Sequence, residues 1–324
     1  MTSANILVTG AAGFIGSTLC QRLLDDGYSV TGVDSFTDYY SPELKQANAR
    51  ELLRNPAFKF LEEDVNVLTR DVSKFEGLDH IVHLAGQPGV RASWGSEFDL
   101  YTHANVSATQ RLLEVARALP DLKSFVYASS SSVYGNAATF PSSEAGTTQP
   151  FSPYGVTKLA GEHLASLYAS NFGVPTRSLR FFTVYGPRQR PDMAFTKFFR
   201  HILDGTPIPV YGDGTQLREF TFVDDVVDAV HRATVLPLTP GTVMNVSGGS
   251  TVSLKDVISL LKTDLSLDFD VRTLPSIAGD VRRTGGTTDV IRNLTGWRPL
   301  VPLADGLAKQ WCWAQQTHKD GIHA

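Results

Sequence analysis

The stretch Asn5-Ile6-Leu7-Val8-Thr9-Gly10-Ala11-Ala12-Gly13-Phe14-Ile15-Gly16 decides the fold of this chain. Its first five residues form a short apolar run closed by a glycine, which predicts a buried strand. Apolar positions then recur at helical spacing over residues 14–26, and residues 28–34 predict a second strand. The order strand, glycine turn, helix, strand is that of a βαβ unit. In such a turn backbone N–H groups meet a pyrophosphate at the positive end of the helix, so the stretch predicts a dinucleotide site.

The glycines and the acidic residue that ends the second strand specify this ligand further. Gly10 and Gly13 permit a tight turn and a close approach of the pyrophosphate, and Gly16 lets the helix pack near the sheet. Asp34 can accept hydrogen bonds from an adenosine ribose and would repel a 2′-phosphate. We therefore expect NAD rather than NADP. The alternative is a turn with a purely structural role.

The alternation of strands and helices continues along the chain. Apolar runs predict strands at residues 58–61, 80–84, 124–129 and 176–181, and helices at 105–119 and 154–172. This pattern predicts an α/β fold with a doubly wound parallel Rossmann sheet over residues 1–186. After Pro187, prolines separate shorter elements, with strands expected at 243–246 and 269–271. We expect residues 187–324 to form mainly a smaller C-terminal α/β substrate-binding part, with some of the chain returning to the first domain.

Composition excludes several classes of protein. The 324 residues carry a formal net charge of −4, which gives no field to attract nucleic acid or an anionic membrane. No apolar run approaches the ~20 residues that span a bilayer, and the first residues lack the basic region of a signal peptide. We expect a cytoplasmic protein with no nucleic-acid or membrane partner. We also expect no metal, because His80 and His83 would point to opposite faces of a strand.

A tyrosine and a lysine form the second notable pattern, Tyr154-Gly155-Val156-Thr157-Lys158. Residues four apart share one face of a helix, so both side chains point to the same place. A free phenol has a pKa of about 10, but an adjacent ammonium and a nicotinamide charge favour the phenolate. Tyr154 can then exchange a proton with a substrate hydroxyl while hydride moves to the cofactor. Such a pair is also common on ordinary amphipathic helices.

Several motifs together give the chain a family resemblance. They are the glycine turn, His83 to Gly86, Tyr127 to Gly135, Tyr154 to Lys158, Leu179 to Pro187 and Arg218 to Asp225. Over nearly its whole length the chain resembles the extended short-chain dehydrogenases/reductases, in the NAD-dependent epimerase/dehydratase branch. The resemblance implies that Ser130 is the third catalytic residue beside Tyr154 and Lys158. It also implies a homodimer built by packing the helices at 105–119 and 154–172 into a four-helix bundle.

The resemblance also implies contacts along the whole cofactor. Asp64 and Val65 would lie along the adenine, Ser129 would face the nicotinamide, and Lys158 would hold its ribose. The full expected NAD site is Gly10, Gly13, Phe14, Ile15, Gly16, Asp34, Asp64, Val65, Leu84, Ala85, Gly86, Ser129, Tyr154, Lys158 and Phe181.

The type of reaction follows from an absence within this family. Its members oxidise C4 of a nucleotide sugar, and dehydratases then use an Asp-Glu pair placed just after the catalytic serine or threonine. Related decarboxylases keep a glutamate there. This chain has Ser131 and Ser132 at those positions, so no carboxylate is available as acid or base. The 4-keto intermediate is therefore expected to take hydride back on its other face, which is 4-epimerisation.

The substrate is inferred from two further stretches. Residues 87–91 and 180–195 are most similar to those of UDP-glucuronate 4-epimerases. The hydroxyls of Ser131, Ser132 and Thr183 could bind a C6 carboxylate without adding negative charge. Such a cradle would protect the 4-keto uronate, a β-keto acid, from losing CO₂. Two alternatives stay open: a 4-epimerase of UDP-glucose or UDP-N-acetylglucosamine, and a non-catalytic NAD-binding module.

The second half of the chain is expected to hold the uridine diphosphate. Guanidinium groups match phosphate geometry, which makes Arg190, Arg218 and Arg282 candidates, although Arg283 could replace Arg282. Arg91 is expected near the same site. Phe195 and Tyr211 are candidates to flank the uracil, with a place in the core as the alternative for both.

Overall fold

The computed structural model describes residues 4–137, 139–275 and 283–320. Its main element is a seven-stranded sheet in the order β10-β6-β5-β4-β1-β2-β3, with every neighbouring pair parallel. This confirms the predicted doubly wound Rossmann fold. The strands are β1 (Asn5–Thr9), β2 (Ser29–Asp34), β3 (Phe58–Glu62), β4 (His80–His83), β5 (Ser124–Ser130), β6 (Thr176–Phe181) and β10 (Thr242–Val246).

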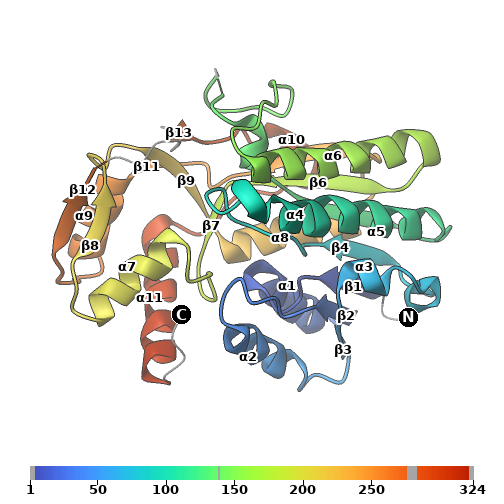
Figure 1. Ribbon diagram of the computed structural model, residues 1–324, viewed down its shortest axis with the longest axis horizontal. Coiled ribbons are helices and arrows are strands. Elements are labelled where there is room, and N and C mark those ends of the chain that lie inside the picture. The colour runs from blue at the N-terminus through green and yellow to red at the C-terminus, as the bar shows by residue number, and fades with distance from the viewer. Residues whose placement is uncertain (1–3, 138, 276–282, 321–324) are drawn as a thin grey trace.

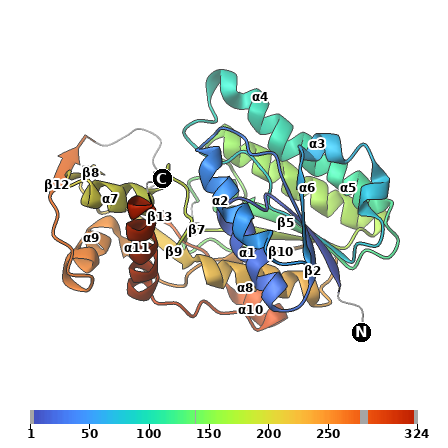
Figure 2. The same cartoon turned by 90° about the horizontal axis from the view of Figure 1, so that it is seen from below.

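Two layers of helices cover the sheet, one on each face (Figures 1 and 2). The alternation of β1 explains why both faces need cover: Ile6 and Val8 enter one hydrophobic core and Leu7 enters the other. One layer contains α1 (Phe14–Asp25), α2 (Pro42–Leu52), α8 (Val223–Val235) and α10 (Asp289–Thr295). The other contains α3 (Val65–Leu68), α4 (Phe98–Tyr101), a π-helical turn (Thr102–Ser107), α5 (Ala108–Arg117) and α6 (Pro153–Phe172).

The smaller part of the chain lies beside the large sheet (Figure 1). Its helices are α7 (Ala194–Leu203), α9 (Leu254–Thr263) and α11 (Leu303–Lys319). Its strands form two small sheets: β7 (Thr183–Tyr185), β9 (Leu217–Phe222), β11 (Thr251–Ser253) and β13 (Arg283–Thr284) in one, β8 (Ile208–Tyr211) and β12 (Val271–Leu274) in the other. Although they follow residue 187, β10 pairs with β6 and α8 packs on α1, so this stretch returns to the large sheet. The division of the chain at residue 186 stays a prediction.

Two predicted elements differ from the structure. The strand expected at 269–271 lies at β12 instead, because pairing with β8 begins at Val271, while the Phe269 side chain is buried in the core. The helix expected from residue 105 already begins at α4 and continues through the π-helical turn, where polar His103 and Asn105 interrupt the apolar periodicity. Among the described residues, no helix is both long enough and apolar enough to cross a membrane.

Candidate active site

The glycine turn between β1 and α1 is built from backbone approaches that leave no room for side chains. Gly10 has a φ of 70°, and a Cβ there would lie 2.9 Å from the backbone nitrogen of Ala85. A Cβ on Gly16 would collide with the carbonyl oxygen of Gly10. The N-cap of α1 is Gly13, which offers no side chain to the first N–H groups of the helix. The turn therefore presents bare backbone at a helix N-terminus, as an anion site requires.

A cavity of about 400 Å³ opens at the carboxyl ends of the parallel strands, beside this turn. Every residue that we predicted to contact NAD lines it, so the structure brings the whole set together. These residues are Gly10, Gly13, Phe14, Ile15, Gly16, Asp34, Asp64, Val65, Leu84, Ala85, Gly86, Ser129, Tyr154, Lys158 and Phe181. Their contacts with NAD itself remain a prediction.

Asp34 joins the glycine turn to the loop that follows β2. One carboxylate oxygen accepts a hydrogen bond from the backbone N–H of Ala12 at 3.1 Å. The other accepts from the N–H of Phe36 at 3.0 Å. The carboxylate is thus fixed at the cavity wall, where an acceptor for ribose hydroxyls is expected.

The cavity wall also contains residues that were not predicted from the sequence, among them two groups. One follows β2 and includes Tyr39, Tyr40 and Lys45; the other, Leu100, His103 and Ala104, comes from α4 and the π-helical turn. The first could have been found, because loops after the carboxyl ends of parallel strands carry ligands in such sheets. The second had no signal, since only tertiary packing brings that helix to the cavity.

The first two turns of α6 place Tyr154 and Lys158. Ser152 caps the helix by accepting a hydrogen bond from the N–H of Gly155 at 3.1 Å, and Pro153 occupies the first position. The Lys158 ammonium is buried and donates to the carbonyl oxygen of Ala128 at 3.0 Å. Burial lowers the pKa of Lys158 to about 8. Both side chains line the cavity, as their spacing predicts.

Opposing influences set the protonation of Tyr154. Burial raises the pKa of its phenol, while a hydrogen bond with Ser130 and the charge of Arg190 lower it. The shift is upward, so in this structure the phenol is protonated at neutral pH. The positive side chain that favours its ionisation here is Arg190, a residue predicted to bind the diphosphate.

The serine segment at the end of β5 rests on a buried ion pair. The Ser129 hydroxyl donates to Glu162 Oε2 at 2.7 Å, and Glu162 Oε1 lies 2.5 Å from Arg180 Nη2. Arg180 also donates to the Tyr134 hydroxyl at 2.7 Å. Glu162 was not predicted from the sequence, although it stands four residues after Lys158 and shares the helix face of Tyr154.

The three hydroxyls proposed to hold a carboxylate lie just after the carboxyl ends of two neighbouring strands, β5 and β6. Ser130 pairs with Phe181 in the register of β5 and β6. Ser131 and Ser132 follow the first strand and Thr183 follows the second, and all three are half-buried. The Ser132 N–H donates to the Ser130 hydroxyl at 3.1 Å, which fixes the start of this turn.

The structure places the residues predicted to bind the nucleotide in different parts of the protein. Arg190 lines the cavity and Arg218 lies in β9. Arg91 is exposed, and Tyr211, the last residue of β8, is 40% exposed. Arg282 lies outside the described residues. Phe195 is 1% exposed and packs on Phe220, with ring centroids 4.7 Å apart, so its ring lies in the core, which was the alternative place for it. The apolar face of α7 turns it into the core.

The buried histidines of β4 have hydroxyl partners. His80 shares a hydrogen bond with Ser124, and His83 with Thr9 and Thr109. In the part of the chain that the structure describes, no three His, Cys, Asp or Glu side chains gather as metal ligands would.

Comparisons with known proteins agree with this geometry. The model of the NAD dependent epimerase/dehydratase family matches residues 6–247. A Bacillus subtilis protein named as an uncharacterized UDP-glucose epimerase is 43% identical over 94% of this chain and 96% of its own length. A probable UDP-glucuronate 4-epimerase of Rhizobium meliloti is 36% identical, with 97% of each chain covered. The crystal structure of UDP-glucuronic acid 4-epimerase from Bacillus cereus with UDP-glucuronic acid and NAD superposes with a TM-score of 0.90, at 42% identity, over 96% of this chain and 99% of that one.

Proposed function

The chain belongs to the NAD-dependent epimerase/dehydratase family of extended short-chain dehydrogenases/reductases, and from this premise we propose that it is an NAD-dependent UDP-sugar 4-epimerase acting on UDP-glucuronate. The observation that carries the proposal is the pair Ser131 and Ser132 beside the Ser130–Tyr154–Lys158 site. A family member that eliminates water or CO₂ is expected to hold a carboxylate there, and this chain holds hydroxyls.

The residues of the cavity fit NAD. The glycine turn admits backbone only, Asp34 provides a fixed acceptor, and the ammonium of Lys158 lies buried in the wall. When bound, NAD supplies the chemistry of taking hydride from C4 of the sugar and returning it.

The side chains of this protein would move the accompanying proton. Tyr154 would take the proton of the C4 hydroxyl as that carbon is oxidised, and return it after the keto sugar has presented its other face. Ser130, which lowers the pKa of Tyr154, would hold the same oxygen. The charges of Lys158 and Arg190 would stabilise the phenolate while it carries no proton.

The neutral hydroxyls explain why a uronate suits this site. Ser131, Ser132 and Thr183 donate hydrogen bonds without bringing a negative charge towards the C6 carboxylate. A carboxylate held in a polar cradle resists decarboxylation of the 4-keto sugar. A similar site without this cradle would suit UDP-glucose, and the name of the Bacillus subtilis relative keeps that sugar as the second candidate.

The proposal includes a homodimer formed through α5 and α6. Its support is the apolar surface of α6, where Val156 and Leu167, three helical turns apart on one face, are each at least 50% exposed. Large exposed apolar side chains on one helix face favour burial against a partner. The cytoplasmic location also stays a proposal from the sequence.

Product analysis tests the function directly. We expect purified protein incubated with UDP-glucuronate and NAD to form UDP-galacturonate, separated by chromatography. Release of a UDP-pentose, or no uronate product, would contradict the proposal. Replacing Thr183 by valine should reduce turnover of UDP-glucuronate far more than turnover of UDP-glucose. Equal losses with both substrates would show that Thr183 does not bind the C6 carboxylate.

A further inference from the structure

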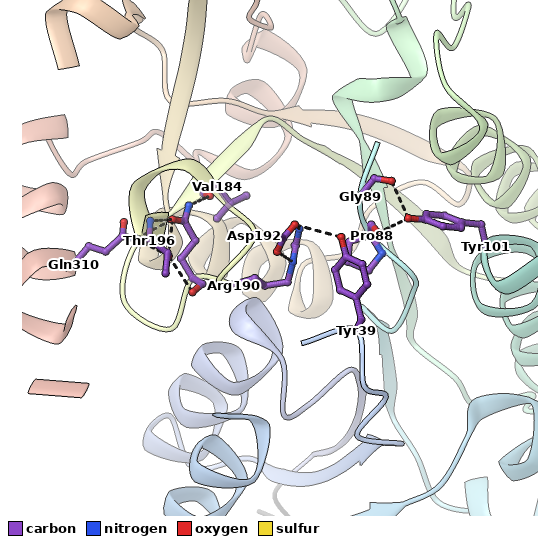
Figure 3. A network of polar contacts seen from close by, with 10 residues as sticks. Tyr39, Pro88, Gly89, Tyr101, Val184, Arg190, Asp192, Thr196 and Gln310 are labelled. Carbon is purple, nitrogen blue, oxygen red and sulfur yellow. Dashed lines mark hydrogen bonds and ion pairs between the residues drawn. The ribbon is translucent and has the colours of Figure 1, made fainter. Parts of the chain in front are cut away.

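The segment between β7 and α7, residues 186–193, has a base fixed by two buried glutamines (Figure 3). Gln310 of α11 donates to Gln189 Oε1 at 2.8 Å and accepts from the N–H of Gly186 at 2.9 Å. Gln189 in turn donates to the carbonyl oxygen of Val184 at 3.0 Å. Both glutamines are at most 2% exposed. The base of the segment is therefore a rigid platform.

The tip of this segment carries a bidentate ion pair. Arg190 donates from Nε to Asp192 Oδ1 at 2.9 Å and from Nη2 to Oδ2 at 3.0 Å. Two parallel hydrogen bonds fix the plane of a guanidinium as well as its position. Because Arg190 lines the cavity, Asp192 determines where this positive charge faces the cofactor site.

A hydrogen bond crosses from the ion pair to the opposite wall of the cavity. The hydroxyl of Tyr39, in the loop after β2, donates to Asp192 Oδ2 at 3.3 Å (Figure 3). Tyr39 also lines the cavity, so the chain Tyr39–Asp192–Arg190 joins its two walls.

The turn at Gly89 packs closely against the Tyr39 hydroxyl and limits its position. Gly89 has a φ of 106°, and a Cβ there would lie 2.5 Å from the Tyr39 hydroxyl oxygen. The Tyr101 hydroxyl holds this turn by donating to the carbonyl oxygens of Pro88 at 2.8 Å and Gly89 at 2.9 Å. The ring of Tyr101 packs edge-on against Tyr154, with centroids 6.2 Å apart. The crossing contact is thus supported by the same elements that hold the catalytic tyrosine.

We infer that Asp192 and Tyr39 are positioning residues: they hold Arg190 in the cavity wall and clasp the two walls together over bound NAD. The inference rests on the proposed use of NAD and is independent of which sugar is the substrate. The clasp slows dissociation of the cofactor, which an epimerase needs because the same NAD must return the hydride that it took.

The test is the rate at which NAD leaves the holoenzyme, measured without sugar nucleotide by dilution into a coupled enzyme that consumes free NAD. Because Asp192→Asn removes the negative charge and one of the two hydrogen bonds that fix Arg190, it should release NAD about tenfold faster, equivalent to about 1.4 kcal/mol. Tyr39→Phe should accelerate release about threefold. In an Arg190→Gln background, Asp192→Asn should accelerate release by no more than Tyr39→Phe does, because only the hydrogen bond from Tyr39 then remains to be weakened.

The matched control is Glu51→Gln. Glu51 lies in α2 and forms an ion pair of 2.6 Å with Arg188, so it ties the same segment to the same part of the protein without touching Arg190. Its release rate should equal that of the wild type, and thermal unfolding at saturating NAD should show all variants folded.

Three results would overturn the inference: release within twofold of wild type in both Asp192→Asn and Tyr39→Phe, equal acceleration by Glu51→Gln, or a full effect of Asp192→Asn without Arg190. Wild-type protein that binds no NAD would contradict the proposed function instead, and this is seen before any variant is made.

Discussion

Replacing Glu162 by glutamine removes the carboxylate that neutralises Arg180 inside the protein. The side chains of Glu162 and Arg180 are 4% and 5% exposed. Arg180 also donates a hydrogen bond from Nε to Glu162 Oε2 at 3.0 Å. Removing one partner of a buried ion pair costs about 3–5 kcal/mol, because the other charge stays buried. Arg180 keeps its bonds to Tyr134 and to the carbonyl oxygen of Glu144, so we expect a loss of about 3 kcal/mol in the free energy of unfolding.

The assay is urea unfolding of wild type and Glu162→Gln at one saturating NAD concentration, because bound ligand changes apparent stability. The control is Asp289→Asn, which breaks an exposed ion pair with Arg292 at the same 2.5 Å distance, and should cost at most about 1 kcal/mol. Changing Glu162 and Arg180 together to methionine should restore much of the loss, because no buried charge remains. A loss in Glu162→Gln no larger than in the control, or a double variant less stable than the single one, would refute this reasoning.

Three other outcomes follow from the site and the core. Tyr154→Phe should keep NAD but lose turnover by about 10²–10⁴-fold, as expected for an acid–base group, and unchanged turnover would exclude that role. Gly16→Ala should destabilise the protein by about 1–3 kcal/mol in thermal or urea unfolding and weaken NAD binding, because the new Cβ collides with Gly10; wild-type stability would contradict the packing. Burial lowers the pKa of His83 from 6.5 to about 3, so below pH 6.5 the unfolded state binds the extra proton and stability falls with decreasing pH. His83→Gln should therefore reduce the slope of unfolding free energy between pH 6 and 4.5 by about 1.4 kcal/mol per pH unit, whereas an unchanged slope would show that His83 is not the titrating group.

Residues close together in the chain made much of this protein predictable. Strand β1, the glycine turn and α1 follow from the local pattern, and the pair Tyr154 and Lys158 follows from the helical repeat. The positions of the predicted cofactor residues needed one further rule, that parallel strands present their carboxyl ends at one edge. All of these signals are read within a few residues or from strand order, and every predicted cofactor residue lies in the cavity wall.

Only the tertiary structure decided which distant side chains meet. Phe195 had two possible places, and packing against Phe220 put it in the core. The pair Glu162–Arg180 and the contact between Tyr39 and Asp192 join separate elements of the fold. The physical reason is that periodicity specifies which face of an element is buried, whereas the partner on that face depends on how whole elements pack. Sequence by itself therefore determined the cofactor turn and the catalytic helix, and tertiary packing determined the ion pair behind the serines and the clasp across the cavity.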